Sequence, residues 1–325
     1  MGSTETDAVV AAAKRGDEAA FTALTERYRQ ELRVHCYRML GSFEDAEDLV
    51  QETFLRAWRR RETYQGRSTF RAWLYRIATN ACLDAIERRA RAMSSTNSPG
   101  EISWLEPYPD ELLAAPADEP DAATVAKETI ELAFLVAIQH LPPRPRAVLI
   151  LRDVLDWSAK DTAALLDTTV AAVNSALQRA RATLKQQLPE RRIEWTSEDP
   201  TEEERELLAR YVEASERADA QRLAALMRED SRFSMPPEPE MFVGRDTIVT
   251  AWIEGGFGSE EFGDIRCVLT RANMQPAVAN YVRSPGEERY RRLALDVLRI
   301  EHGRIAEITA FMPKTFDAFG LPEML

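Results

Sequence analysis

Five prolines fall within residues 95–126, a stretch that also holds seven acidic residues and no basic one. Proline lacks a backbone donor and clashes with the preceding helical turn, so no continuous helix can run through this stretch. The acidic side chains repel one another and favour an extended chain. A chain interrupted in this way cannot fold as one continuous domain. The segment therefore predicts a linker between separately folded parts.

The predicted linker is not uniformly polar. Its large apolar residues are Trp104, Leu105, Tyr108, Leu112 and Leu113. An inert spacer has no need of such side chains, because water solvates them poorly. We therefore expect this part of the linker to dock on a folded part of the chain.

A second boundary lies between Pro189 and Pro200, where a basic pair gives way to an acidic run. Together the two boundaries divide the chain into domains at residues 1–94, 127–188 and 200–325, with the linker at residues 95–126. A chain of 325 residues is long enough for two or three domains.

Several classes of protein are disfavoured. No apolar run approaches the roughly 18–20 residues that span a bilayer, and the N-terminus lacks a secretory pattern. The three cysteines are scattered, which favours a reducing compartment, and the three histidines lack metal-ligand spacing. We therefore expect a cytoplasmic protein with no metal, no cofactor and no membrane contact.

The net charge of −12 is unevenly distributed. Residues 1–94 and 127–188 each carry +2, whereas residues 95–126 carry −7 and residues 189–325 carry −9. The overall acidity therefore does not exclude a nucleic-acid partner for the first and second domains.

The first domain reads as all-α. Apolar residues between Ala46 and Trp58 recur at helical spacing, and Ser42 with Asp45 three residues later marks the start of that helix. A second helix spans Phe70 to Ala85, with a loop at Gly66 between the two. Residues 7–40 read as one or two further helices.

Residues 56–76 carry seven basic residues and one acidic residue, with five aromatic residues interleaved. Arginines bind phosphates while aromatic rings stack on unpaired bases, so this mixture is typical of single-stranded nucleic-acid binding. A solvated basic face over an aromatic core explains the pattern equally well. Trp58 and Phe70 belong to the core under either interpretation.

The second domain contains a predicted helix-turn-helix. Ser158 and Asp161 begin a short helix, Asp167 supplies a turn, and a helix follows from about Thr169 to Leu184 with Val170 and Val173 on its inward face. Its outward face carries Asn, Gln and Arg, which pair with base edges in the major groove.

Together these stretches resemble the extracytoplasmic-function sigma factors of the sigma-70 family. Residues 45–58 resemble region 2 where it binds the clamp helices of RNA polymerase, and residues 69–80 resemble the segment that opens and reads the −10 element. Residues 140–149 and 173–181 resemble region 4, which reads the −35 element. Asn174 and Ala176 stand where many relatives carry Lys and Arg.

The resemblance implies three sets of site residues and no catalytic ones. The polymerase-facing set is Asp45, Asp48, Leu49, Gln51, Glu52 and Phe54, of which Leu49 and Phe54 also suit a core. The −10 set is Arg60, Arg61, Tyr64, Arg67, Ser68, Thr69, Arg71, Trp73, Arg76, Asn80 and Asp84. The −35 set is Thr169, Ala171, Asn174, Ser175, Gln178, Arg179 and Arg181. The implied partners are core polymerase, through its clamp helices and flap, and promoter DNA.

The C-terminal third reads as a helical pair over residues 203–228 followed by strands at 265–269, 276–282, 293–300 and 305–311. Helices followed by an antiparallel sheet predict an α+β domain. The order resembles SnoaL-like domains, whose fold is a cone-shaped barrel. The expected fold class is therefore two all-α domains, a region 2 helical bundle and a region 4 helix-turn-helix, followed by an α+β cone.

Three functions remain open for the whole chain. We favour a sigma factor regulated by its acidic third domain through contact with the sigma domains. The alternatives are an enzyme or a ligand sensor built on the SnoaL-like domain, and an ordinary helix-turn-helix repressor. Candidate pocket residues are Asp230, Trp252, Tyr281 and Asp296, although ordinary strand and core roles explain them better.

Overall fold

The computed structural model describes residues 2–66, 69–94, 105–113, 132–187, 201–236, 238 and 240–325. The chain divides into two compact units. The first unit comprises Met1–Pro99 and Leu113–Leu188, and the second comprises Gly100–Leu112 and Pro189–Leu325. The predicted first and second domains thus share one unit, while part of the predicted linker belongs with the C-terminal third.

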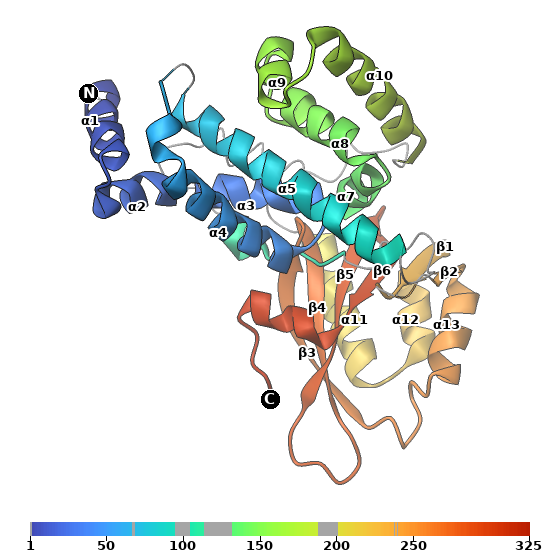
Figure 1. Cartoon of the computed structure of the whole chain (residues 1–325). Helices are drawn as coiled ribbons and strands as arrows, with labels where there is room; N and C mark the ends of the chain where they lie inside the picture. The colour runs from blue at the N-terminus through green and yellow to red at the C-terminus, as the bar shows by residue number, and fades with distance from the viewer. Residues whose placement is uncertain are drawn as a thin grey trace. The chain divides into compact units, whose positions relative to one another are not determined.

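The N-terminal part of the first unit is entirely helical (Figure 1). Its helices are α1 (Gly2–Lys14), α2 (Glu18–Glu26), α3 (Arg29–Leu40), α4 (Phe43–Arg59), the short η1 (Arg61–Thr63) and α5 (Phe70–Ser94). Three helices precede residue 41, where we expected one or two. Gly16 has φ +97° and Asp17 caps α2 through a bond from the Ala20 amide at 3.0 Å, so the first of these helices ends where the second begins.

Local signals set the position of α4. The Ser42 hydroxyl accepts a hydrogen bond from the Asp45 amide at 3.1 Å, which confirms the predicted start. One stripe of α4 is buried, as its spacing predicts; it consists of Ala46, Leu49, Val50, Thr53 and Ala57. Gly66 has φ +70° in the loop before α5.

The second half of the unit contains α7 (Leu132–Gln139), α8 (Pro143–Leu149), a single π-helical turn η3 (Ile150–Val154), α9 (Ala159–Leu165) and α10 (Val170–Gln187). Asp167 adopts φ +52° between α9 and α10, which confirms the predicted turn. Val173 is fully buried, but Val170 is 42% exposed. The prediction for Val170 was wrong, because this residue lies in the first turn of α10, where its side chain remains open to solvent.

The second unit combines helices with a six-stranded sheet. Its elements are η2 (Asp110–Leu113, at the boundary between the units), α11 (Glu202–Glu216), α12 (Ala220–Leu226), β1 (Met227–Ser234), β2 (Met241–Val243), α13 (Arg245–Glu254), β3 (Asp264–Ala272), β4 (Gln275–Arg283), β5 (Arg291–Glu301), β6 (Arg304–Phe311) and η4 (Pro313–Phe319). The strand order is β2-β1-β6-β5-β4-β3.

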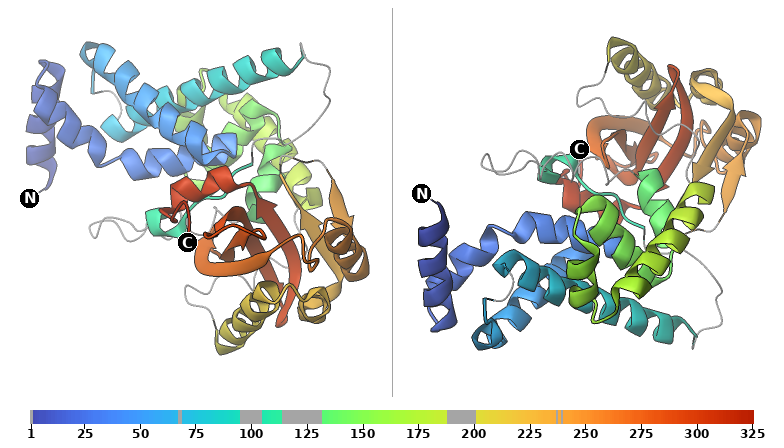
Figure 2. Two further views of the ribbon diagram at one scale, coloured as in Figure 1. Left: turned by 90° about the horizontal axis from the view of Figure 1, so that it is seen from below. Right: turned by 90° about the horizontal axis from the view of Figure 1, so that it is seen from above.

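The sheet is mixed, because β1 runs parallel to β6 while the other neighbours are antiparallel. It is not a closed barrel: β2 and β3 form its edges. Helices α11, α12 and α13 cover one face (Figures 1 and 2), and the main core of the unit lies between them and the sheet. The architecture confirms an α+β cone and corrects the expectation of an antiparallel barrel.

The hairpin joining β3 to β4 has an unusual turn. Asn273 and Met274 both have positive φ, at +55° and +62°. Two such residues in succession form the turn that suits antiparallel strands, although glycine is the usual choice at the second position. Asn273 is fully buried.

Candidate nucleic-acid interface

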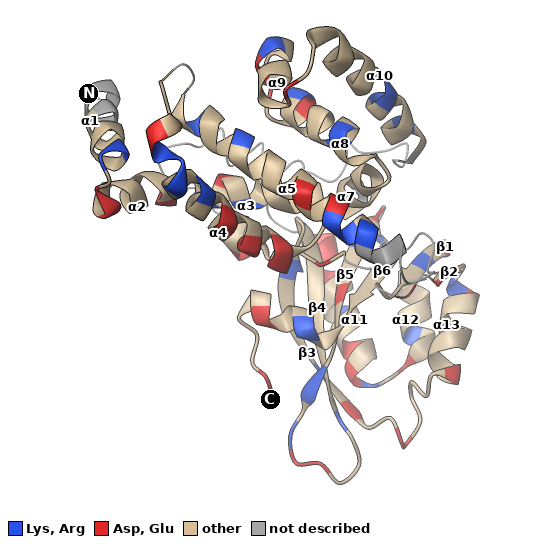
Figure 3. Ribbon diagram, viewed as in Figure 1, with Lys and Arg blue, Asp and Glu red and all other residues tan. Residues whose placement is uncertain are grey.

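One face of α4 is exposed along its length. Asp48, Gln51 and Leu55 recur on it at helical spacing and are exposed, with Glu52 partly exposed beside them. Figure 3 shows acidic residues along α4 and basic ones at its C-terminal end and in η1. Leu55 is 52% exposed and was missed by the sequence analysis, where its apolar character gave no reason to place it outside.

The other predicted polymerase-facing residues are less accessible. Leu49 is buried in the core. Phe54 is partly buried, with the Arg29 guanidinium 5.2 Å from its ring centroid. Asp45 pairs with Arg89. The structure thus brings together Asp48, Gln51, Glu52 and Leu55 as the exposed face.

Three aromatic residues of the basic stretch at residues 56–76 form a partly exposed cluster. The Tyr64, Phe70 and Trp73 rings pack together, with centroids 5.4–5.6 Å apart. Phe70 is buried, as predicted, whereas Tyr64 and Trp73 retain exposed edges. The Thr69 hydroxyl caps α5 by accepting a bond from the Ala72 amide at 3.1 Å. Arg67 and Ser68 lie outside the described residues.

Five predicted residues align along one face of α5. Thr69, Trp73, Arg76, Asn80 and Asp84 recur at three- and four-residue spacing. Arg76 and Asn80 are exposed, whereas Asp84 pairs with Arg56 of α4 at 2.9 Å.

The arginines of the stretch differ in accessibility. Arg60 is exposed. The Arg61 guanidinium lies 4.2 Å from the Trp58 ring centroid. Arg71 points to the opposite side of α5 from Arg76 and pairs with Glu31 of α3 at 2.8 Å. The structure therefore does not bring Arg71 to the face that carries Arg76 and Asn80.

His35 is a buried polar residue near Arg71, and its charge does not change at physiological pH. His35 Nε2 lies 2.9 Å from the Thr79 hydroxyl. Burial, together with the nearby Arg38 and Arg71 charges, lowers the pKa of His35 to about 3. His35 therefore stays neutral at physiological pH and supports the packing of α3 on α5.

All seven predicted −35 residues lie on exposed positions of, or just before, α10. Thr169 caps the helix through a bond from the Ala172 amide at 3.1 Å. Arg179 donates to the Ser175 hydroxyl at 3.0 Å, and Arg181 pairs with Asp153 at 2.7 Å. The exposed face thus also carries Ala171, Asn174 and Gln178, while Ser175 and Asp153 bind the two arginines.

A polar cluster lies on the helix-covered face of the sheet in the second unit. The Tyr211 hydroxyl and the Asn280 amide both donate to Asp296 Oδ2, at 3.0 and 2.6 Å. The Cys267 thiol donates to Asn280 Oδ1 at 3.2 Å. Burial raises the pKa of Asp296 to about 6, against the two hydrogen bonds, which lower it.

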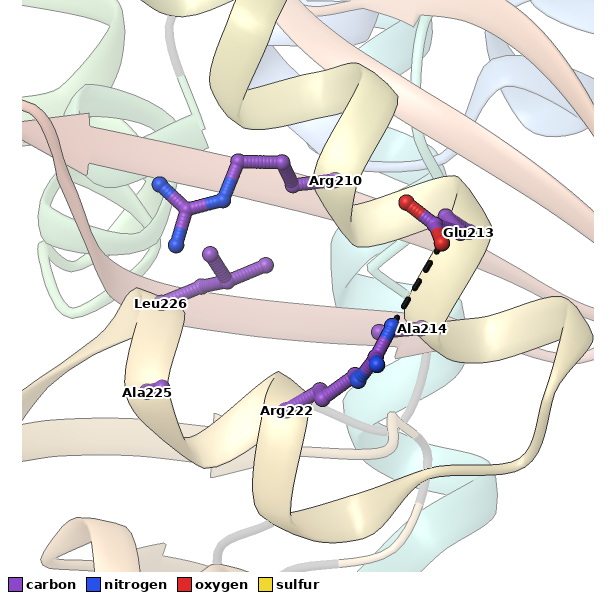
Figure 4. A pocket seen from close by; sticks show the side chains of 6 residues that line it. All are labelled: Arg210, Glu213, Ala214, Arg222, Ala225 and Leu226. Carbon is purple, nitrogen blue, oxygen red and sulfur yellow. Dashed lines mark hydrogen bonds and ion pairs between the residues drawn. The ribbon is translucent and has the colours of Figure 1, made fainter.

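The four residues that the sequence analysis named as candidate pocket residues do not lie together in one site. The Tyr281 hydroxyl donates to the Pro322 carbonyl at 2.8 Å, and Asp230 pairs with Arg228 on the surface. Trp252 packs against the core. A small pocket of about 230 Å³ instead lies between α11 and α12 (Figure 4); its lining residues are Arg210, Glu213, Ala214, Arg222, Ala225 and Leu226.

Residues 105–110 of the predicted linker dock on the turn between β3 and β4. The Tyr108 amide donates to Asn273 Oδ1 at 2.8 Å, and the Asn273 amide donates to the Tyr108 carbonyl at 2.9 Å. The Met274 amide and the Arg271 guanidinium both donate to the Asp110 carboxylate, at 2.8 and 3.2 Å. Leu105 and Tyr108 are buried, which confirms that the apolar linker residues dock; Trp104 lies outside the described residues.

Comparisons with known proteins agree with this arrangement. Family models of Sigma-70 region 2, Sigma-70 region 4 and a SnoaL-like domain match residues 24–92, 131–184 and 208–308. The chain is 43% identical to the ECF RNA polymerase sigma factor SigG of Mycobacterium tuberculosis, over 96% of this chain and 86% of that protein. The chain belongs to the ECF sigma factors.

Two further similar proteins differ in how much of this sigma factor they cover. The ECF sigma factor SigW of Bacillus subtilis is 30% identical over 54% of this chain and 92% of its own length. The crystal structure of SigJ of Mycobacterium tuberculosis covers 93% of this chain and 99% of its own, with a TM-score of 0.59 and 23% identity. This sigma factor therefore carries a fused SnoaL-like domain, and the SigJ structure shares its fold.

Neither a membrane-spanning helix nor a metal-binding cluster occurs within the described part of this sigma factor. No helix there is both long and apolar enough to cross a membrane. No group of three or more His, Cys, Asp or Glu side chains there could hold a metal ion.

Proposed function

We propose that this sigma factor directs core RNA polymerase to promoters and that its SnoaL-like domain restrains it by holding the linker. The observation that carries the restraint is the set of four hydrogen bonds that join Tyr108 and Asp110 to the β3–β4 turn. The linker joins the two sigma regions, so a domain that binds the linker limits how far and how freely those regions separate.

Charge supports a restraining role. Residues 189–325 carry a net charge of −9, and DNA phosphates repel acidic surfaces. An unconstrained linker of residues 95–126 could extend over about 105 Å at 3.3 Å per residue. Docking ties the middle of that span to an acidic domain, which opposes the approach of DNA to the sigma regions.

The exposed face of α4 supports contact with the clamp helices of core polymerase. Its acidic and amide groups suit a polar rim, and Leu55 supplies an apolar centre. We expect region 4 to contact the flap.

Replacing Leu55 with serine should lower the affinity for core polymerase by about 5- to 20-fold, because a half-exposed leucine buries apolar surface on binding. Titration of labelled sigma factor with core polymerase measures this change. Leu269 on β3 is equally exposed, at 54%, and Leu269→Ser is the matched control that should bind normally. Equal affinities of both variants and the wild type would remove Leu55 from the interface.

The aligned face of α5 supports binding to the −10 element. Arg76 and Asn80 follow Trp73 on one face of α5, and the Trp73 ring packs on Tyr64, so this face can combine phosphate contacts with base stacking. The exposed face of α10 supports major-groove contacts at the −35 element.

Replacing Arg76 with alanine should weaken open-complex formation by the holoenzyme and reduce the slope of its salt dependence by about one. The measurement is the fraction of open complex on a selected promoter across a range of salt concentrations. Arg76→Lys keeps the charge and should retain the slope. If the alanine variant also keeps the wild-type slope, Arg76 does not contact a phosphate.

A second candidate function is small-molecule binding or turnover by the SnoaL-like domain. The specific observation in its favour is the Asp296 cluster, in which a carboxylate of raised pKa lies among apolar side chains. Asp296 already accepts bonds from Tyr211 and Asn280, so a structural role explains the same geometry. The sigma function needs no catalytic residue in this domain.

A further inference from the structure

Two consecutive residues of the β3–β4 turn hold a conformation that is costly for them. Asn273 and Met274 have φ +55° and +62°, where glycine is the usual choice at the second position. Residues other than glycine rarely adopt positive φ, and they persist in it mainly at binding and functional sites. Here the turn directs two successive backbone amides to the linker. The Asn273 amide donates to the Tyr108 carbonyl, and the Met274 amide donates to the Asp110 carboxylate.

Two cations flank these amides. The Arg271 guanidinium donates to the Asp110 carboxylate at 3.2 Å, and the Lys314 ammonium donates to the Glu106 carboxylate at 3.3 Å. The two carboxylates are four positions apart in the chain. Charge-assisted hydrogen bonds are stronger than neutral ones, so a carboxylate at each of these two positions raises the affinity of a segment for the turn. The site therefore recognises backbone groups together with a defined spacing of acidic side chains.

The segment that occupies the site is suited to binding in an extended form. Tyr108 lies halfway between the two carboxylates and is fully buried, and its amide and carbonyl both bond to Asn273. Pro107 and Pro109 flank it; each fixes its own φ and disfavours a helical conformation of the residue before it. Pro109 also forms an antiparallel bridge with Ala272. The segment therefore loses little conformational entropy on binding, as other proline-rich peptide ligands do.

Water reaches both ion pairs of the site. The Lys314 side chain is 69% exposed and the Arg271 side chain is 30% exposed. Ion pairs that water reaches contribute little to affinity. The linker also binds as part of the same chain, which gives it an effective concentration on the order of 1 mM. Its occupancy of the site thus depends on attachment as well as on contacts, and a second segment of the same chemistry competes with it.

We propose that the β3–β4 turn, together with Arg271 and Lys314, is a peptide-recognition site, and that an extended acidic segment of a partner protein binds it and displaces the linker. That segment carries an aromatic residue midway between two carboxylates four positions apart, as Glu106, Tyr108 and Asp110 are in the linker. The inference rests on the proposed restraint by linker docking, and it names the kind of partner that ends the restraint.

The first test is the binding of a peptide to the full-length chain. The probe is a fluorescein-labelled peptide of residues 105–112, LEPYPDEL, and its anisotropy is measured. The Asp110→Ala chain should bind the peptide about tenfold more tightly than the wild type, because its own linker has lost two bonds and competes less. A peptide with alanine in place of Asp110 should bind about fivefold more weakly than LEPYPDEL.

Variants of the site show where the peptide binds. In the Asp110→Ala background, Arg271→Ala should weaken peptide binding by about 5- to 20-fold. Lys314→Ala should weaken it by about two- to threefold, because its ion pair is more exposed. Arg266→Ala is the matched control, since Arg266 is an exposed arginine of the same strand, and it should bind the peptide normally. Thermal melting followed by circular dichroism identifies a variant that fails to fold; if Arg271→Ala does so, Lys314→Ala decides.

The second test measures transcription. The peptide at about 1 mM, which matches the effective concentration of the linker, should increase promoter-dependent transcription by the wild-type holoenzyme. The Arg271→Ala holoenzyme should not respond. A peptide that binds at the site without changing transcription leaves the site standing and overturns the proposed restraint. If Asp110→Ala increases transcription but neither chain binds the peptide, the restraint stands and the peptide-recognition site fails.

A second copy of this chain is the alternative occupant, since it carries the same linker. Light scattering across a range of protein concentrations should show a monomer for the wild type. A dimer that the Arg271→Ala variant no longer forms would mean that the linker of a second copy occupies the site, and it would overturn a separate partner protein.

Discussion

Replacing Asp110 with alanine in the full-length chain should increase promoter-dependent transcription by about 5- to 20-fold. The carboxylate of Asp110 accepts bonds from the Met274 amide of the turn and from the Arg271 guanidinium of β3. Loss of these bonds costs about 1–2 kcal/mol of docking free energy, which shifts the linker toward its released form. The measurement is multiple-round transcription with purified core polymerase.

Two further variants test whether loss of the docking bonds causes the increase in transcription. Glu111→Ala changes the neighbouring exposed acidic residue and should transcribe at the wild-type rate, which excludes a simple effect of linker charge. Asn273→Gly removes the partner of the Tyr108 amide while glycine still accepts the positive φ of the turn, so it should increase transcription like Asp110→Ala. A decrease in both docking variants would show that docking supports transcription instead of restraining it.

Replacing Asp296 with asparagine should change how the stability of the second unit depends on pH. Burial raises the pKa of Asp296 to about 6 in the folded chain, above its ordinary value of 3.8. Between these values the folded state binds more protons than the unfolded state, so the free energy of unfolding falls as pH rises from about 4 to about 6. The loss above pH 6 is at most about 3 kcal/mol.

Asparagine keeps an oxygen for the bonds from Tyr211 and Asn280 but does not ionise. The variant should therefore lack this pH dependence and be more stable than the wild type at pH 7. Urea unfolding at a series of pH values measures both effects. Asp246 is 96% exposed, so Asp246→Asn should follow the wild type at every pH. An unchanged profile for Asp296→Asn would mean that Asp296 titrates as an ordinary surface carboxylate.

Local signals in the sequence predicted the local structure. The cap at Ser42, the turn at Asp167 and the buried stripe of α4 depend on residues within a few positions of one another, and all three are confirmed. The order of elements in the C-terminal third also gave its fold class, because helices followed by strands leave few layered arrangements.

Contacts between distant residues were not predictable in the same way. β1 lies within the span that the sequence assigned partly to a helix, and its charged residues conceal a strand whose parallel partner, β6, follows about 75 residues later. Arg71 was placed with Arg76 from the resemblance and the helical spacing, but Glu31, 40 residues away, binds it on the other side of α5. The docked linker depends on pairings of this kind.

The separation between the linker and its docking site also has a consequence for synthesis. Tyr108 and Asn273 are 165 residues apart, with the linker made first. At about 5–20 residues per second, a ribosome completes both sigma regions, which end near residue 188, roughly 4–17 s before the β3–β4 turn is made. Each newly made molecule therefore passes through an interval in which both sigma regions exist without the β3–β4 turn on which the linker docks.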